Sequence, residues 1–216
     1  MMGQQLTPVH TLYSFRRCPY AMRARMALRS SAIELQLREV VLKNKPVAML
    51  EASSKATVPV LVLNDGTVID ESLEIMLWSL RQNDPLNLLS ANDSETQSLI
   101  RTNDNIFKIH LDHYKYSERF PEHTKLHYRQ KGEEFLNQLN QKLKQQAFLL
   151  NNKPTLADIA IFPFIRQFAH VDIKWFENSH YSSLSNWLNY WLDNELFLGV
   201  MSKYPQWEEG QEPVIF

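Results

Sequence analysis

The pattern of hydrophobic and polar positions changes near residue 80 of the 216-residue chain. Before that point, short β-rich runs alternate with helical patterns, and after it one helical pattern follows another. This change predicts an α/β domain followed by an all-α domain. The joint falls in QNDPLNLL, where Asn, Asp and Pro disfavour continuation of a helix. We therefore predict a first domain at 1–82, a linker at 83–89 and a helical domain at 90–216.

The pattern of the first domain predicts, in order, a strand, a helix, a strand, a hairpin and a helix. HTLYSF is the first strand, and PYAMRARMALRSS is a helix whose first turn suits Pro19, since a missing N–H costs nothing there. The strand LQLREVVL and the loop LKNKP follow. VPVLVL and TVID then form a hairpin closed by NDG, and a helix runs from Glu71 to about Gln82.

The second domain shows four helical patterns. They run from Ser94 to about Phe120, from about Glu122 to Leu149, from Thr155 to about His170, and from Leu184 to about Asn194. The third opens with TLAD, in which Thr155 and Asp158 have the spacing of a capping box. The fourth repeats Leu and Trp at helical spacing, and this stripe predicts core packing rather than a ligand site.

Composition favours a soluble protein of a reducing compartment. With 44% hydrophobic residues, the chain can bury a substantial core. Its single cysteine, Cys18, forms no internal disulfide, and the opening MMGQQLTPVHTLY lacks the continuous apolar segment of a signal peptide. No window approaches the roughly 18 uninterrupted apolar residues of a membrane helix. We expect a cytoplasmic protein without a membrane partner.

Positive charge is concentrated near the start of the chain, although the formal net charge is only −1. No acidic residue precedes Glu34, while five arginines occupy the same segment: Arg16, Arg17, Arg23, Arg25 and Arg29. Their positive potential predicts an anionic partner nearby. A pI near 6.7 and the lack of a long basic face favour a small anion over nucleic acid.

Cys18 lies where a predicted strand gives way to a helix. Unpaired N–H groups and the helix dipole stabilise a thiolate at such a position, and the adjacent Arg16 and Arg17 add positive charge. The alternative is that Cys18 is simply a small buried hydrophobe. A strand, then Cys-Pro, then a helix is the thioredoxin-type arrangement, but Ala21 stands where a redox pair has its second cysteine.

Four separated segments carry a family resemblance: FRRCPYAMRARMAL, LKNKP, TVPVL followed by DES, and TLADIAIFPF. In their order and spacing they resemble the cytosolic glutathione transferases, and within them the cysteine-type members such as the omega class. The resemblance implies a thioredoxin-like N-terminal domain and an all-helical C-terminal domain. It also implies a homodimer that uses glutathione as co-substrate.

The resemblance assigns roles to individual residues. Cys18 is the catalytic thiol. Val58 would pair its backbone with the cysteinyl unit of glutathione, and Pro59 would hold the cis peptide that exposes that backbone. Glu71 and Ser72 would receive the γ-glutamyl end, with the carboxylate meeting the ammonium group. As alternatives, Pro59 is an ordinary strand-start proline and the Glu71–Ser72 pair only caps a helix.

Further positions complete the implied glutathione pocket. Lys45 would meet the glycyl end, because a cation suits a terminal carboxylate, or else it is a solvated loop lysine. Phe15 and Tyr20 flank the thiol and shape its pocket. Of Arg16 and Arg17, one would point to glutathione and the other to solvent, and Arg17 is our candidate.

A second pocket would take the other substrate. The resemblance places one helix of the second domain beside the active-site cleft, and its residues at helical spacing are our candidates for a hydrophobic wall: Phe107, His110, Leu111 and Tyr114. Interdomain packing is the alternative. The histidine pairs His110/His113 and His123/His127 each share a helical face but lack a third ligand, so we expect no metal.

The sequence thus predicts a glutathione-dependent thiol transferase with a redox or detoxifying role. Cys18 attacks a glutathionyl mixed disulfide or a glutathione adduct, becomes glutathionylated and is released by a second glutathione. One alternative is a conjugating transferase in which Cys18 only donates a hydrogen bond. The other is a non-enzymatic interaction protein on the same fold, like the stringent starvation proteins.

Overall fold

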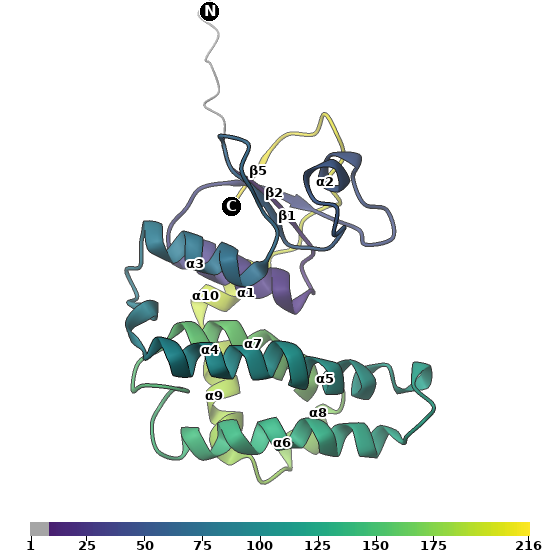
Figure 1. Cartoon of the computed structure of the whole chain (residues 1–216), viewed down its shortest axis with the longest axis vertical. Helices are drawn as coiled ribbons and strands as arrows, with labels where there is room; N and C mark the ends of the chain where they lie inside the picture. The colour runs from purple at the N-terminus through teal and green to yellow at the C-terminus, as the bar shows by residue number, and fades with distance from the viewer. Residues whose placement is uncertain (1–8) are drawn as a thin grey trace, which may run out of the picture. The chain divides into compact units, whose positions relative to one another are not determined.

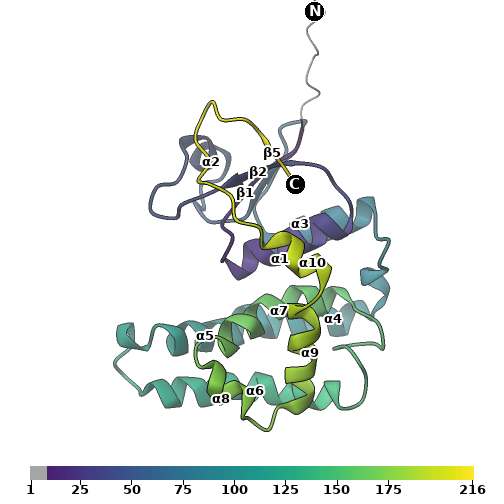
Figure 2. The same ribbon diagram turned by 180° about the vertical axis from the view of Figure 1, so that it is seen from behind.

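The computed structural model describes residues 9–216, and Figures 1 and 2 show its ribbon from opposite sides. Residues 1–8 lie outside the described residues. The prediction that the chain opens without a signal peptide falls largely on these residues. Contacts divide the chain into two compact units. The first joins the segment up to Pro85 with Leu198–Phe216, and the second is Leu86–Phe197. Leu198–Phe216 thus groups with the first unit, whereas the sequence placed it in the helical domain.

A five-stranded sheet in the order β4-β3-β1-β2-β5 forms the first unit. Its strands are β1 (Thr11–Ser14), β2 (Gln36–Glu39), β3 (Val60–Val62), β4 (Val68–Ile69) and β5 (Val214–Ile215). Its helices are α1 (Pro19–Ser30), α2 (Val47–Ala52) and α3 (Ser72–Gln82). Because β1 and β2 are parallel, the chain must cross over between them, and α1 makes that crossover.

The two faces of the sheet bury different residues, since successive side chains of a strand point to opposite sides. Leu12 is buried with Ile75 of α3 on one face. Tyr13, the next residue of β1, is buried with Met49 of α2 on the other. Helices α1 and α3 pack side by side (Figures 1 and 2). The end of β1, where the candidate thiol follows, is therefore held in the middle of a packed sheet.

The end of the chain adds the edge strand β5. It runs antiparallel to β2, and Phe216 exchanges backbone hydrogen bonds of 2.9 and 3.3 Å with Leu35. Farther back, the Trp207 N–H donates to the carbonyl of Glu39 at 2.8 Å. Helix α2 was not predicted from the sequence either, because its six residues follow Pro46 in what looked like a loop.

The second unit is helical. Its helices are α4 (Asp93–Thr102), α5 (Lys108–Lys115), α6 (Lys125–Leu143), α7 (Leu156–Ala169), α8 (Ile173–Glu177) and α9 (Ser182–Leu192). The last helix of the chain, α10 (Glu195–Val200), crosses the boundary between the two units. The helix predicted from Ser94 is instead α4 and α5, joined by a π-helical turn at Asn103–Phe107. The capping box is confirmed, since Asp158 accepts from the Thr155 N–H at 2.8 Å. The predicted class, α/β plus all-α, is confirmed.

Within residues 9–216, none of the helices combines the length and apolar character needed to cross a membrane.

Candidate functional site

Cys18 immediately precedes α1, as the sequence predicted. Its backbone is extended, with φ −73° and ψ 123°, and its carbonyl accepts from the Met22 N–H at 2.8 Å. Pro19 then opens the helix with no N–H to satisfy. The Cys18 side chain is half-buried, so the sulfur lies at the edge of the core and not inside it.

The segment around Pro59 lies against the thiol. Cys18 Sγ is 3.7 Å from the carbonyl oxygen of Val58 and donates to it, although forty positions separate them in sequence. The Val58–Pro59 peptide is cis, as the resemblance implied. Both residues are buried just before β3 begins at Val60. Two of the four resembling segments are thus adjacent in space.

Glu71 and Ser72 lie where β4 gives way to α3. Ser72 is buried, and its Oγ accepts from Nε of Arg23 at 3.0 Å. Glu71 is exposed and forms an ion pair with Lys55, whose Nζ lies 2.6 Å from Glu71 Oε1 and 3.0 Å from Asp70 Oδ1. Hydrogen bonds to these two carboxylates raise the pKa of Lys55. Because Lys55 is exposed, water screens the pair and its net contribution to stability is small.

Asp70 connects this ion pair to the buried part of the unit. Its other carboxylate oxygen accepts from the Ser53 hydroxyl at 2.6 Å. The hydrogen bonds from Ser53 and Lys55 hold the pKa of Asp70 below its ordinary value. The sequence did not predict Lys55 or Ser53 as site residues, because a lysine and a serine in the segment SSK carry no signal that separates them from an ordinary loop.

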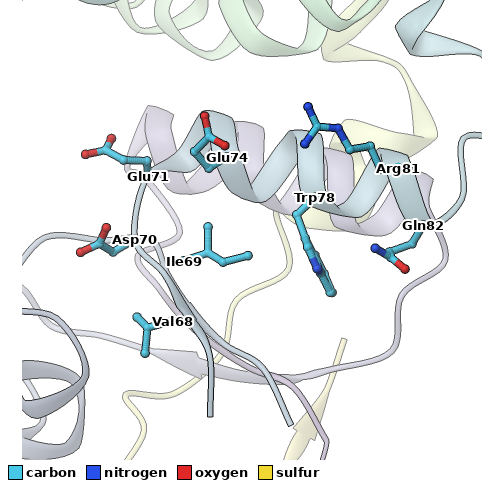
Figure 3. Close-up of a pocket in the computed structure, with 8 residues that line it drawn as sticks. All are labelled: Val68, Ile69, Asp70, Glu71, Glu74, Trp78, Arg81 and Gln82. Atoms are coloured by element: carbon cyan, nitrogen blue, oxygen red, sulfur yellow. The ribbon is translucent and has the colours of Figure 1, made fainter. Parts of the chain in front are cut away.

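A cavity of about 390 Å³ opens along α3 and β4, beside Glu71 (Figure 3). Asp70 and Glu71 stand at one end and Arg81 and Gln82 at the other, with Trp78 between them (Figure 3). Glu71 is the only predicted site residue that lines this cavity, and Cys18 and Ser72 are not part of its wall. The cavity therefore adjoins the proposed γ-glutamyl position without enclosing the thiol.

The aromatic residues next to Cys18 each face an arginine. Phe15 is half-buried, and the guanidinium of the exposed Arg17 lies 5.6 Å from its ring centre. Tyr20 is half-buried too, and the guanidinium of Arg23 lies 5.0 Å from its ring centre. Arg23 therefore contacts both Tyr20 and Ser72. Tyr20 and Ser72 were both predicted as site residues, and the arginine that contacts both of them was considered in the sequence only as local positive charge.

Lys45 lies in the loop before α2. It lines a cavity of about 340 Å³ together with Gln206, Trp207, Glu208 and Glu209 from the end of the chain. This C-terminal wall, like β5, could not be anticipated from residues so distant in sequence.

The four candidates for the second-substrate wall lie in the helical unit. Phe107, Leu111 and Tyr114 are buried, with exposed fractions of 0%, 0% and 2%. Phe107 packs on Phe135 and Phe168, with ring centres 5.1 and 5.3 Å apart. The side chains of Phe107, Leu111 and Tyr114 are therefore buried in the helical unit, and their part in a second-substrate wall stays a prediction. His110 is half-buried, and burial lowers its pKa.

The histidine pairs show no metal site. Among residues 9–216, no group of three or more His, Cys, Asp or Glu side chains is arranged to hold a metal ion. The rings of His123 and His127 stack with their centres 4.1 Å apart.

Two family models match the chain, one in each unit. The model for the glutathione S-transferase N-terminal domain matches residues 12–88, and the model for the C-terminal domain matches residues 112–189. The fold is accordingly a thioredoxin-like domain followed by a helical domain, as the resemblance implied. The chain belongs to the glutathione transferase family.

Curated relatives match only part of the chain. Glutathione S-transferase omega-1 of Mus musculus is 37% identical over 62 residues, and the Rattus norvegicus protein of the same name is 39% identical over 62 residues. Each match covers 29% of this chain and 26% of the relative, so it spans about a quarter of the relative's length.

Solved structures share the fold over most of the chain. A glutathione transferase family member from Pseudomonas fluorescens, with two glutathione bound, has a TM-score of 0.74 at 17% identity and covers 92% of this chain and 95% of its own. The glutathione transferase URE2P6 from Phanerochaete chrysosporium, in complex with oxidized glutathione, has a TM-score of 0.77 at 18% identity, with coverages of 89% and 94%. At these identities the likeness establishes the fold.

Proposed function

We propose that this glutathione transferase acts as a thiol transferase through Cys18. The Cys18 thiolate attacks the glutathione sulfur of a mixed disulfide, a bond forms between the two sulfurs, and the substrate leaves as a thiolate that takes up a proton. A second glutathione thiolate then attacks the glutathionylated Cys18, which releases glutathione disulfide and restores the thiolate. The observation that carries the proposal is the half-buried Cys18 at the start of α1, beside the Val58 carbonyl.

Glutathione is proposed to lie along the residues that flank the thiol. Its cysteinyl unit would pair with the backbone at Val58 and Pro59, and its γ-glutamyl end would meet Glu71 and Ser72. Arg23 supports this assignment, because Ser72 Oγ already accepts from Arg23 and its own proton is left to donate to a carboxylate. Phe15, Arg17 and Tyr20 would line the pocket around the sulfur, with Lys45 at the glycyl end.

The cysteine-type subclass is part of the proposal and rests on the residues themselves. The matches to omega-1 proteins agree with it but cover a quarter of their length. We further propose a cytoplasmic homodimer, for which light scattering should give about twice the 25.4 kDa of one chain. A mass of one chain at micromolar concentration would contradict the dimer.

Membership of the family also favours a second activity, conjugation of glutathione to electrophiles. In that reaction glutathione is the nucleophile, and Cys18 would only donate a hydrogen bond to its thiolate. The two activities therefore make opposite demands on the sulfur, since exchange needs a covalent bond to Cys18 and conjugation does not.

A parallel assay of the wild type and Cys18→Ser separates the two activities. One assay follows glutathione release from a glutathionylated peptide, and the other follows conjugation to an aromatic halide, at the same glutathione concentration. We expect Cys18→Ser to lose exchange and to keep conjugation, because a serine hydroxyl accepts no glutathionyl group but still donates a hydrogen bond. Mass spectrometry should show a glutathione adduct on Cys18 of the wild type after treatment with glutathione disulfide. Retained exchange in Cys18→Ser would show that the proposed mechanism is wrong.

A further inference from the structure

Arg23 and Arg25 are the two buried arginines of α1 near Cys18, and Arg25 is the one whose guanidinium contacts the residues before the thiol. Only 1% of its surface is exposed, and its guanidinium turns back from α1 toward the loop after β1. One terminal nitrogen donates to the hydroxyl of Ser14 and, at 3.4 Å, to the carbonyl of Phe15. The other donates to the carbonyl of Arg16 at 2.7 Å. A single side chain thus holds the strand end and the two residues that lead to the thiol.

The same guanidinium interacts with two groups that become negative when ionised. They are the thiol of Cys18 and the carboxylate of Glu39, and the other titratable side chains that interact with it are Arg16 and Tyr204. Glu39, half-buried at the end of β2, also accepts from the Arg16 N–H at 2.7 Å. The loop is therefore held from two sides, by a buried cation and by a half-buried carboxylate.

Arg25 remains a cation at neutral pH despite its burial. Burial lowers the pKa of Arg25 to about 10, which still lies well above 7, while Glu39 and Cys18 oppose that lowering. Burial likewise raises the pKa of Glu39. Water screens a buried charge much less than an exposed one such as that of Arg17. The charge of Arg25 consequently acts more strongly on its neighbours than the exposed charge of Arg17 does on its own.

We propose that Arg25 is the positioning residue of Cys18: its guanidinium fixes the loop that carries the thiol and supplies the positive charge that favours the thiolate, while Glu39 competes for that charge. The proposal deepens the function proposed above. The use of a positioned thiolate rests on that function, but the effect of Arg25 on the thiol does not. Its effect belongs to the thiol and is measurable without glutathione. It also adds a buried charge to those of Arg16 and Arg17, the two arginines nearest to Cys18 in sequence.

The test follows the alkylation rate of the intact protein by iodoacetamide against pH. Because Cys18 is the only cysteine, the whole thiol signal belongs to it.

We expect the midpoint for Arg25→Gln to rise by roughly one pH unit, since the thiolate loses a nearby opposite charge. Arg25→Lys keeps the charge and should return the midpoint toward the wild type. The midpoint for Glu39→Gln should fall, because the competing carboxylate is gone. Arg29→Gln, exposed on the same helix, is the matched control and should leave the midpoint unchanged.

The opposite signs expected for Arg25→Gln and Glu39→Gln make the result decisive. Glu39→Gln keeps an acceptor for the Arg16 N–H, so it decides the case even where Arg25→Gln does not fold. A Glu39→Gln midpoint at or above that of the wild type overturns the proposal. An unchanged midpoint for a folded Arg25→Gln, or an equal rise for Arg25→Lys, overturns it as well. If the shifts occur but the wild type shows no glutathione exchange, the role of Arg25 stands and the proposed function fails.

Discussion

In each unit of the molecule, a buried charged side chain secures the segment before a helix. In the first unit Arg25 donates to the residues that lead into α1. In the helical unit Asp158, fully buried, accepts from groups before and beyond α7: the backbone N–H and hydroxyl of Thr155, the N–H of Leu149 and the indole N–H of Trp187. The structural device is the same, although one group is a cation that donates and the other a carboxylate that accepts.

The two groups differ in what surrounds them. Arg25 interacts with a half-buried thiol and with Glu39, so its charge bears on the ionisation of a reactive group. The hydrogen-bond donors to Asp158 are two backbone groups, a hydroxyl and an indole, none of which reacts as a nucleophile at neutral pH. Loss of Arg25 should therefore be seen in the reactivity of Cys18, and loss of Asp158 in the free energy of unfolding.

The largest expected effect is on stability, from Asp158→Ala. This change leaves the N–H groups of Leu149, Thr155 and Trp187 without their acceptor. Because each buried donor left unsatisfied costs about 1 to 3 kcal/mol, we expect the free energy of unfolding to fall by at least about 3 kcal/mol. Urea unfolding followed by circular dichroism measures this loss.

A matched control for this prediction is Asp172→Ala. Asp172 is exposed and accepts from the Trp175 N–H at 3.0 Å at the start of α8. Loss of such a cap costs about 1 kcal/mol. Equal losses for the two variants would show that burial of Asp158 does not distinguish it from an ordinary helix cap, and the comparison with Arg25 would then fail.

A smaller effect is expected on ligand affinity, from Ser72→Ala. Ser72 is tied to Arg23 much as Ser14 is tied to Arg25, so it tests whether a second buried arginine of α1 also serves the site. Loss of a hydrogen bond to a charged group costs about 1.5 to 3 kcal/mol, which weakens glutathione binding roughly ten- to a hundred-fold. Calorimetric titration of each variant with glutathione gives the dissociation constant.

Ser79→Ala is the control for that measurement. Ser79 is also buried in α3, and its hydroxyl donates to the carbonyl of Met76 in its own helix. We expect its dissociation constant to equal that of the wild type. If Ser72→Ala behaves like Ser79→Ala, the γ-glutamyl end of glutathione does not lie at Ser72.

The sequence predicted the elements whose signals are local. Pro19 after Cys18 and the TLAD segment each identify a helix start within a few residues, and both starts are confirmed. The strand β5 and helix α2 were not predicted, because two apolar residues near the end of the chain and six residues after a proline are too short to show a period.

The predicted site was limited in the same way. Local patterns placed Cys18 at a helix start but gave no sign of which arginines are buried, because the buried Arg23 and Arg25 and the exposed Arg29 look alike in RARMALR. Burial depends on what packs against α1, and those partners come from β2, α3 and the end of the chain. The proximity of Val58 to Cys18 was implied by the family resemblance alone, since no local pattern joins residues so distant in sequence.

The smallest expected effect concerns His110, a half-buried titratable group of the helical unit. Burial lowers the pKa of His110 below its ordinary value of 6.5, and among its charged neighbours Glu134 opposes this while His113, Lys131 and His127 add to it. With a lowered pKa in the folded state, the unfolded chain takes up the proton first as the pH falls. The stability that this group contributes is therefore fully present above pH 6.5 and is lost as the pH falls through the pKa of His110 in the folded state.

The measurement is the free energy of unfolding of wild type minus that of His110→Gln, between pH 8 and pH 5. This difference should be constant at the alkaline end and should decrease toward the acid end, because only the wild type carries the linked proton. His180→Gln removes an exposed histidine of the same unit and gives the baseline. A difference that grows as the pH falls would mean that the folded state stabilises the imidazolium. In that case Glu134 outweighs burial, and His110 is a paired charge like Arg25 instead of a neutral group of the core.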